Sequence, residues 1–126
     1  MADDWKARMI RVRRVYDAPR EDEGVRILVD RLWPRGVKKD DARLTEWARE
    51  AAPSSALRKW IHQDATRWPE FVKRYHAELD EYPEVWASLL EHARRGDVTL
   101  LYAARNTERN NAVALRGYLE ARLADS

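Results

Sequence analysis

The sequence contains no cysteine, which excludes disulfide bonds, thiolate chemistry and cysteine-ligated metals. No apolar run approaches the roughly 20 residues that a membrane-spanning helix needs, and the charged N-terminal stretch has no signal-peptide pattern. No two histidines stand at a metal-ligand spacing, and phosphate-binding loops, dinucleotide fingerprints and nucleophile elbows are missing. We therefore expect a cytoplasmic protein with no membrane partner, no metal and no cofactor.

An excess of charge of one sign is also missing. The chain has 24 Lys and Arg against 22 Asp and Glu, so its formal net charge is only +2 although 37% of the residues are charged. This balance argues against a nucleic-acid binder that relies on charge alone. Large aliphatic residues are sparse, but six Trp and five Tyr can each bury on the order of 150–250 Å². A chain of 126 residues fits one domain, spanning residues 1–126.

Three segments have the pattern of buried strands. Residues 9–16 are rich in β-branched side chains, while residues 25–29 (VRILV) and 98–104 (VTLLYAA) are short continuous apolar runs. Such strands, separated by helical segments, indicate a parallel sheet. The sequence predicts an α/β domain of two or three layers, with a mostly parallel sheet of about three to four strands and four to five helices.

The segments between and after these strands have apolar residues at helical spacing. The expected helices are residues 44–52, a short helix carrying Leu57 and Ile61, a longer one carrying Trp68 to Leu79, residues 83–96, and a last helix ending near Leu123. Their expected N-caps are Ser54, Asp64, and either Asn106 or Thr107.

Arginines follow the two strongest predicted strands. Arg31 and Arg35 come after residues 25–29, and Arg105 comes after residues 98–104. In open α/β sheets ligands bind beyond the carboxyl ends of the strands, and the planar guanidinium fork binds carboxylate or phosphate through two hydrogen bonds. We predict that at least two of these arginines share an anion site. The alternative is that each pairs with an acid at the surface.

Two residues are candidate proton carriers. Asp30 closes an apolar strand, where a carboxylate can act as a base or orient an arginine, or form a salt bridge or a loop cap. His62 carries an imidazole suited to proton transfer, but it lies at a helix end, where the helix dipole gives an equally good structural reason. Whether a reaction occurs is left open.

The predicted site is a pocket for a small anionic ligand at the strand ends. In it Arg31 and Arg35 grip the anion and Asp30 orients them. Further donors and the cover of the pocket are expected from Tyr102, Arg105 and Asn111, and from the segment containing Arg58, Trp60 and His62.

Two other functional classes are compatible with the sequence. Cations and aromatic residues alternate over residues 58–74. In one interpretation the rings stack on nucleic-acid bases and the cations bind phosphates. In the other, the segment is an amphipathic helical pair with its rings in the core and its cations in solvent. The first reading predicts a nucleic-acid-associated or regulatory binding module. The second is compatible with a protein-interaction domain, and a homodimer that covers the edge of the sheet is compatible with either.

Several motifs together resemble a known family. They are residues 29–36 (VDRLWPRG), 52–54 (APS), 57–60 (LRKW), Phe71 with 75–79 (YHAEL), 98–104 (VTLLYAA) and 110–113 (NNAV). This set resembles the YeaO-like branch of the domain-of-unknown-function 488 family over about residues 11–120, and DRLWPRG is its specific element. The resemblance implies a small cytoplasmic bacterial α/β protein. It supplies no established activity, because the family is named for lacking one.

The chain departs from the longer relatives of that family at two motifs. Those relatives carry Asp-x-Arg after the equivalent strand and Cys-His-Arg near the last helix. Here residues 30–32 read DRL and residues 109–112 read RNNA, with neither Cys nor His. A thiol-dependent role therefore cannot transfer. The resemblance keeps Asn110 and Asn111 as polar site candidates, and the alternative is that they satisfy backbone groups in the first turn of the helix.

Overall fold

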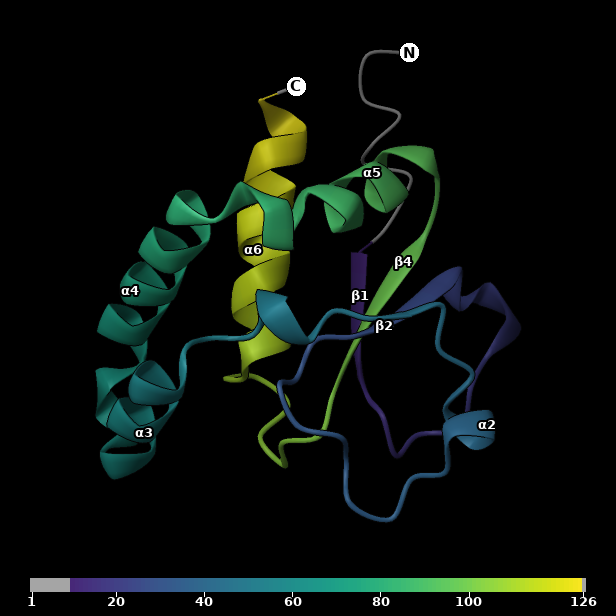
Figure 1. Ribbon diagram of the computed structural model, residues 1–126, viewed down its shortest axis with the longest axis horizontal. Coiled ribbons are helices and arrows are strands. Elements are labelled where there is room, and N and C mark those ends of the chain that lie inside the picture. Colours follow the sequence, from purple (N-terminus) through teal and green to yellow (C-terminus); the bar gives the residue numbers. More distant parts are fainter. Residues whose placement is uncertain (1–9, 126) are drawn as a thin grey trace.

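The computed structural model describes residues 10–125, which contain one parallel sheet with the strand order β1-β4-β2-β3 (Figure 1). The strands are β1 (Ile10–Arg14), β2 (Val25–Leu28), β3 (Glu46–Trp47) and β4 (Val98–Tyr102). Every residue of β4 is buried, because this strand lies between two others and both of its faces are covered. The predicted α/β class with a parallel sheet is confirmed.

All the α-helices except the shortest cover one face of the sheet. The α-helices are α2 (Lys39–Ala42), α3 (Ser55–Gln63), α4 (Trp68–Glu81), α5 (Ala87–Arg95) and α6 (Asn111–Ala124). Short 3-10 turns are formed by Glu21–Glu23, Arg49–Ala51, Ala65–Arg67 and Pro83–Val85. In Figure 1, α6 packs on β1 and β4, α4 and α5 pack on α6, and α3 packs on α4. These four helices share one hydrophobic core with Ile27, Val29 and Leu100.

The opposite face of the sheet is covered by a loop. Leu28 and Leu101 on that face pack against Trp33 and Trp47 of the segment between β2 and the 3-10 turn at Arg49–Ala51. The two indole rings meet edge to face at 5.3 Å between centroids. Each indole N–H is satisfied, since Trp33 donates to the carbonyl of Val37 at 2.7 Å and Trp47 to that of Asp30 at 2.8 Å. The domain therefore has two regular layers, with a tryptophan-bearing loop where a third would lie.

The helix predicted for residues 44–52 is wrong. Glu46–Trp47 forms β3, which pairs with Ile27 and Leu28, and a 3-10 turn follows. The N–H of Ala48 donates to the carbonyl of Leu28 at 2.8 Å, which extends the pairing. The apolar spacing of 3, 4 and 7 residues arises because Trp47 covers one face of the sheet while Ala48 and Ala51 enter the main core on the other.

Two helix starts also differ from the prediction. The last helix begins at Asn111 with Asn110 as its cap, whose Oδ1 accepts from the N–H of Val113 at 2.9 Å. Asn106 instead closes a turn by accepting from the N–H groups of Glu108 and Arg109. The segment from Pro83 divides into a 3-10 turn and α5. The predicted cap Ser54 is confirmed. Asp64 caps the 3-10 turn Ala65–Arg67 and not the longer helix, because α4 begins at Trp68 with Arg67 in its N-cap position and no side-chain cap. Met9 of the first predicted strand lies outside the described residues.

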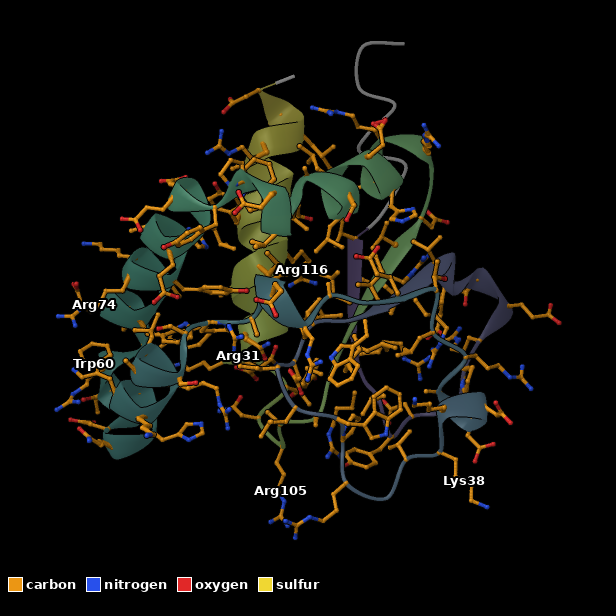
Figure 2. All side chains as sticks on the ribbon, in the orientation of Figure 1. Arg31, Lys38, Trp60, Arg74, Arg105 and Arg116 are labelled. Atoms are coloured by element: carbon orange, nitrogen blue, oxygen red, sulfur yellow. The ribbon has the colours of Figure 1, made fainter. Side chains whose placement is uncertain are left out.

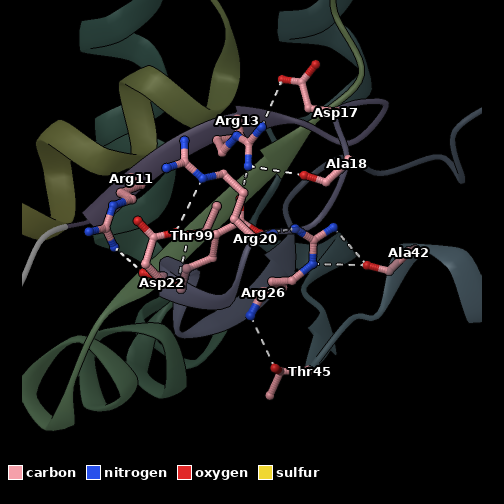
Figure 3. Close-up of polar contacts among 11 residues, drawn as sticks. Arg11, Arg13, Asp17, Ala18, Arg20, Asp22, Arg26, Ala42, Thr45 and Thr99 are labelled. Carbon is pink, nitrogen blue, oxygen red and sulfur yellow. Dashed lines mark hydrogen bonds and ion pairs between the residues drawn. The ribbon is translucent and has the colours of Figure 1, made fainter.

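A buried carboxylate joins several arginines beside the start of β2 (Figure 3). Glu23 is 1% exposed and accepts hydrogen bonds from the guanidinium groups of Arg13 and Arg26 and from the N–H of Arg20. Burial by itself raises the pKa of Glu23, but these hydrogen bonds outweigh burial and the net pKa is lowered. Arg26 also donates to the carbonyl of Ala42 at 2.9 and 3.1 Å. The guanidinium groups of Arg13 and Arg26 therefore stabilise the fold through these contacts and are not available to bind a ligand.

Candidate functional site

A cavity of about 800 Å³ lies at the carboxyl ends of β2 and β4. Its walls come mainly from three segments: residues 30–35 after β2, residues 103–111 after β4, and parts of residues 52–71 in the helical layer. In a parallel sheet the carboxyl ends of neighbouring strands share one edge, so the loops that follow them meet there. The cavity thus occupies the edge of the sheet at which the sequence predicts a site.

Most of the predicted site residues line this cavity. They are Asp30, Arg31, Arg35, Arg58, His62, Arg105 and Asn111. In Figure 2, Arg31 lies between the α3–α4 pair and the strands, and Arg105 extends toward solvent beyond the strand ends. Arg58 and His62 lie one helical turn apart on α3, with Arg58 half-buried and His62 exposed. The structure brings together residues that are more than 80 positions apart in the chain, such as Val29 and Asn111, whose side-chain amide donates to the Val29 carbonyl.

Trp60 and Tyr102, both predicted to contact the ligand, do not line the cavity. The guanidinium carbons of Arg67 and Arg74 lie 4.9 and 4.2 Å from the centre of the Trp60 ring, on the side of the helices far from the strands (Figure 2). Tyr102 is 2% exposed and belongs to the main core, since strand alternation places it on the helix-covered face with Leu100.

Four of the five arginines that line the cavity differ from those around Glu23 in having no ion-pair partner among the described residues. Within residues 10–125, none of Arg35, Arg58, Arg105 and Arg109 has an Asp or Glu oxygen within 4.0 Å. The ion pair of Arg31 reaches only the exposed Glu50, at 4.0 Å. Like charges gathered without counter-charges repel one another. The mouth of the cavity therefore favours a negatively charged occupant.

Arg31 is tethered to the loop before α3. Its Nη2 donates to the carbonyls of Ala52 and Pro53 at 3.3 and 3.4 Å. Its Nε–H is buried and has no acceptor in the part of the chain that the structure describes. A buried donor without a partner costs about 1–3 kcal/mol.

Asp30 holds the base of the cavity together. Its Oδ2 accepts from the N–H of Ala103 at 2.9 Å, and its carboxyl also bonds the side chain of Asn111. Burial raises the pKa of Asp30, and the hydrogen bonds from Ala103 and Asn111 and the charge of Arg58 offset only part of that increase. The carboxyl thus joins the ends of β2 and β4 to the start of α6. No arginine lies within ion-pair distance of it among the described residues, so Asp30 does not orient an arginine directly.

Sequence reasoning missed two parts of the lining. Arg109 was placed inside the expected last helix, whereas the loop extends to Asn110 and brings Arg109 to the cavity. Phe71 was predicted only as a core residue of an amphipathic helix, and Trp68 was predicted either as a core residue or as a ring that stacks nucleic-acid bases. Both border the cavity. The candidate caps were Asn106 and Thr107, and Asn110 was not among them. Asparagine is a preferred N-cap residue, so Asn110 is the signal that could have extended the loop.

The described residues contain no group of three or more His, Asp and Glu side chains that could hold a metal ion. No helix between residues 10 and 125 has the length and apolar character to cross a membrane. The geometry defines a small two-layer α/β protein with a cation-lined cavity at the carboxyl edge of its sheet.

Comparisons with known proteins define the family. The family model described as the inactive DUF488-N3 subclade matches residues 9–126, and the chain belongs to this family. It is 43% identical over 112 residues to the uncharacterized protein YeaO of Escherichia coli, covering 89% of this chain and 97% of the relative. It is 41% identical over 113 residues to the uncharacterized proteins Mb3100c of Mycobacterium bovis and Rv3073c of Mycobacterium tuberculosis, covering 90% of this chain and 95% of each. No solved structure matches the chain.

Proposed function

We propose that this protein binds a small ligand bearing a phosphate or carboxylate group in the cavity at the carboxyl ends of β2 and β4. The observation that carries the proposal is the set of arginines that line the cavity without carboxylate partners. Hydrogen bonds from a guanidinium to an oxyanion are charge-assisted and are worth about 1.5–3 kcal/mol each. A ligand anion would supply the acceptors that this part of the protein does not.

Binding without turnover is the role that the site supports best. The Asp30 carboxyl already accepts hydrogen bonds from Ala103 and Asn111, which limits its freedom to take a proton from a ligand. His62 is exposed on the last turn of α3. The family is described as an inactive subclade, and the residues that replace the Cys-His-Arg element of longer relatives carry no nucleophile.

The test is the thermal unfolding of the protein in phosphate or sulfate against chloride at the same ionic strength. A ligand at 100 times its dissociation constant stabilises the folded state by about 2.7 kcal/mol, so we expect a rise in Tm of several degrees. The double variant Arg35→Ala/Arg105→Ala should lose most of that rise, because both residues line the cavity.

A matched control removes the same charge elsewhere. Arg20 and Arg95 are exposed arginines paired with Asp22 and Glu91, and neither lines the cavity. Arg20→Ala/Arg95→Ala should respond to phosphate as the wild type does. An equal response of the cavity variant and the control variant would contradict the proposal.

A further inference from the structure

We infer that the ligand of this cavity is a phosphate ester carrying a flat ring, of about the size of a nucleoside monophosphate, with its phosphate among the cavity arginines and its ring against Trp68. The inference deepens the proposed function and depends on it. Three features of the cavity support it: its volume, the aromatic character of one wall, and the number of arginines on the opposite side.

The volume exceeds what a simple anion fills. Pockets of roughly 300–1,000 Å³ are typical of small-molecule and cofactor sites, and this one measures about 800 Å³. An inorganic phosphate would occupy a small fraction of that space and would leave the apolar wall in contact with water. A ligand that uses both sides of the cavity must therefore join an anionic group to an apolar body.

The wall formed by the helical layer suits a flat ring. The rings of Trp68 and Phe71 are stacked, with 5.3 Å between centroids and 23° between planes. Phe71 is buried, whereas Trp68 is half-buried and borders the cavity together with Ile61 and Pro53. A flat ring that lies on Trp68 would extend this stack. Stacking on an aromatic side chain accepts any of the nucleobases, because each has a flat π face, and it favours flat groups over aliphatic ones.

The loops opposite that wall suit a phosphate. Arg35 lies on the loop after β2, and Arg105 and Arg109 lie on the loop after β4. A carboxylate satisfies one guanidinium fork, whereas a phosphate monoester has three terminal oxygens and a charge approaching −2 at neutral pH, so it can bridge several forks. The separate loops that bear these arginines can therefore bind one phosphate together.

Both loops are held in place before a ligand arrives. The hydroxyl of Tyr16 donates to the carbonyl of Arg35 at 2.9 Å, which holds the first loop. Asn106 Oδ1 accepts from the backbone N–H of Arg109 at 3.0 Å, which closes the turn in the second loop. Fixing these backbones reduces the conformational entropy that binding must overcome.

Isothermal titration calorimetry with four probes tests the inference on the intact protein. The probes are AMP, ribose 5-phosphate, adenosine and inorganic phosphate. We expect AMP to bind at least tenfold more tightly than ribose 5-phosphate, which lacks the ring, and adenosine to bind more weakly than either phosphate ester. Benzoate serves as a further probe, and it should bind at least tenfold more weakly than AMP if the cavity prefers phosphate to carboxylate.

Substitutions of Trp68 separate the ring from the phosphate. Trp68→Leu should bring the affinity for AMP down to that for ribose 5-phosphate and leave the latter unchanged, while Trp68→Phe should keep most of the advantage of AMP. Trp60→Leu is the matched control, because Trp60 does not line the cavity. The comparison of AMP with ribose 5-phosphate on the wild type needs no variant, so it remains decisive if a Trp68 variant fails to fold.

The outcomes distinguish the inferred ligand class, a phosphate ester with a flat ring, from the proposed function, which is anion binding in the cavity. Equal affinities for AMP and ribose 5-phosphate, or benzoate binding as tightly as AMP, would overturn the inferred ligand class and leave anion binding intact. Failure of every phosphate-bearing probe to bind would overturn both. Tight binding of AMP that Trp68→Leu does not weaken would overturn the assignment of the ring to this wall.

Discussion

Asp30 shows how a single residue can border a site without contacting an ionic partner. Its carboxyl is hydrogen-bonded to Ala103 and Asn111, and its backbone carbonyl accepts from the indole of Trp47. The sequence predicted a functional carboxyl here because an acid follows an apolar strand. It could not show that the nearest donor is a backbone N–H of the neighbouring strand, since that contact depends on the register of β2 and β4.

The substitution Asp30→Asn tests this role. Asn keeps an oxygen that can accept from the Ala103 N–H and removes the charge. Burial raises the folded-state pKa of Asp30 above its unfolded value, which is about 3.9. The contribution of such a group to stability is fully present below the unfolded pKa and is lost as the pH rises through the folded pKa. We therefore expect the unfolding free energy of Asp30→Asn, relative to the wild type, to increase from about pH 4 upward.

Urea denaturation at several pH values measures this difference. Asp30→Ala is the comparison, because it also removes the charge but leaves the Ala103 N–H without its acceptor, so it should be less stable than Asp30→Asn by about 1–3 kcal/mol at every pH in the series. A constant difference between Asp30→Asn and the wild type from pH 4 to pH 8 would contradict the assignment of the charge as the unfavourable feature.

The candidate site was partly predictable at the level of single residues. The position of Arg31, Arg35 and Arg105 at one edge of the sheet was predictable, because residues that follow parallel strands meet there. Trp60 was predicted to contact the ligand but does not line the cavity, because a pattern of cations and rings does not say which side of a helix faces a cavity. The packing of α3 on α4 decides that, and it places Trp60 against Arg67 and Arg74.

At the scale of secondary-structure elements, amphipathic helices and buried strands were predicted well, and short elements were not. The α4 pattern is a continuous apolar stripe, with Phe71, Tyr75 and Leu79 buried. Residues 44–52 have a similar spacing of apolar residues, but a two-residue strand followed by a 3-10 turn buries those residues equally well. Elements this short are stabilised by partners distant in the sequence, here β2, so local periodicity cannot identify them.

The junction between the 3-10 turn at Glu21–Glu23 and β2 depends on Gly24. Gly24 has φ of +68°, and a Cβ there would lie 2.1 Å from the carbonyl oxygen of Asp97. That carbonyl accepts from the N–H of Val25 at 3.1 Å, so the backbones cannot separate without loss of this bond. We expect Gly24→Ala to destabilise the fold by on the order of 2–4 kcal/mol, measured by urea denaturation.

Gly117 provides the control for that substitution. It lies within α6, and an added Cβ would meet nothing within 4 Å. Because alanine favours the helix over glycine, Gly117→Ala should stabilise the protein by roughly 0.5–1 kcal/mol. If both alanine variants shifted stability in the same direction by a similar amount, the close approach at Gly24 would not be the cause of its effect.

At the scale of the whole molecule, the net charge of +2 hides a division among the arginines. One group surrounds Glu23 and is neutralised by it and by neighbouring acids. Another group lines the cavity, where Arg31 reaches only the exposed Glu50 at 4.0 Å and the remaining arginines form no ion pair among the described residues. Composition could not predict this division, because it depends on which arginines the folded chain brings near a carboxylate.

This division predicts how ionic strength affects each kind of ligand. A phosphate ester inside the cavity is partly shielded from salt, so its affinity should fall only a few-fold between 50 and 200 mM NaCl. An extended single strand that follows surface cations would lose far more, on the order of 10³-fold or above when six or more phosphates are contacted. We expect AMP to bind at both salt concentrations and a 20-nucleotide single strand to show no saturable binding at 200 mM.

Fluorescence anisotropy with the labelled strand, alongside calorimetry with AMP, makes this comparison. The positive charge outside the cavity is interrupted by acids, as where Arg74 lies 3.2 Å from Glu70, and this limits a continuous track for a backbone. Micromolar binding of the strand with a steep salt dependence would favour the nucleic-acid-associated module that the sequence also allowed.

The loop after β2 has two structural roles: it covers one face of the sheet, and it lines the cavity. Trp33 shields the face of the sheet opposite α3, α4, α5 and α6, while its neighbours Arg31 and Arg35 border the cavity. A change in the length or conformation of this loop would both displace the two arginines and expose Leu28 and Leu101 to solvent. Substitutions that change ligand selectivity should therefore destabilise the protein less in the loop after β4 or in α3, because these segments do not cover Leu28 and Leu101.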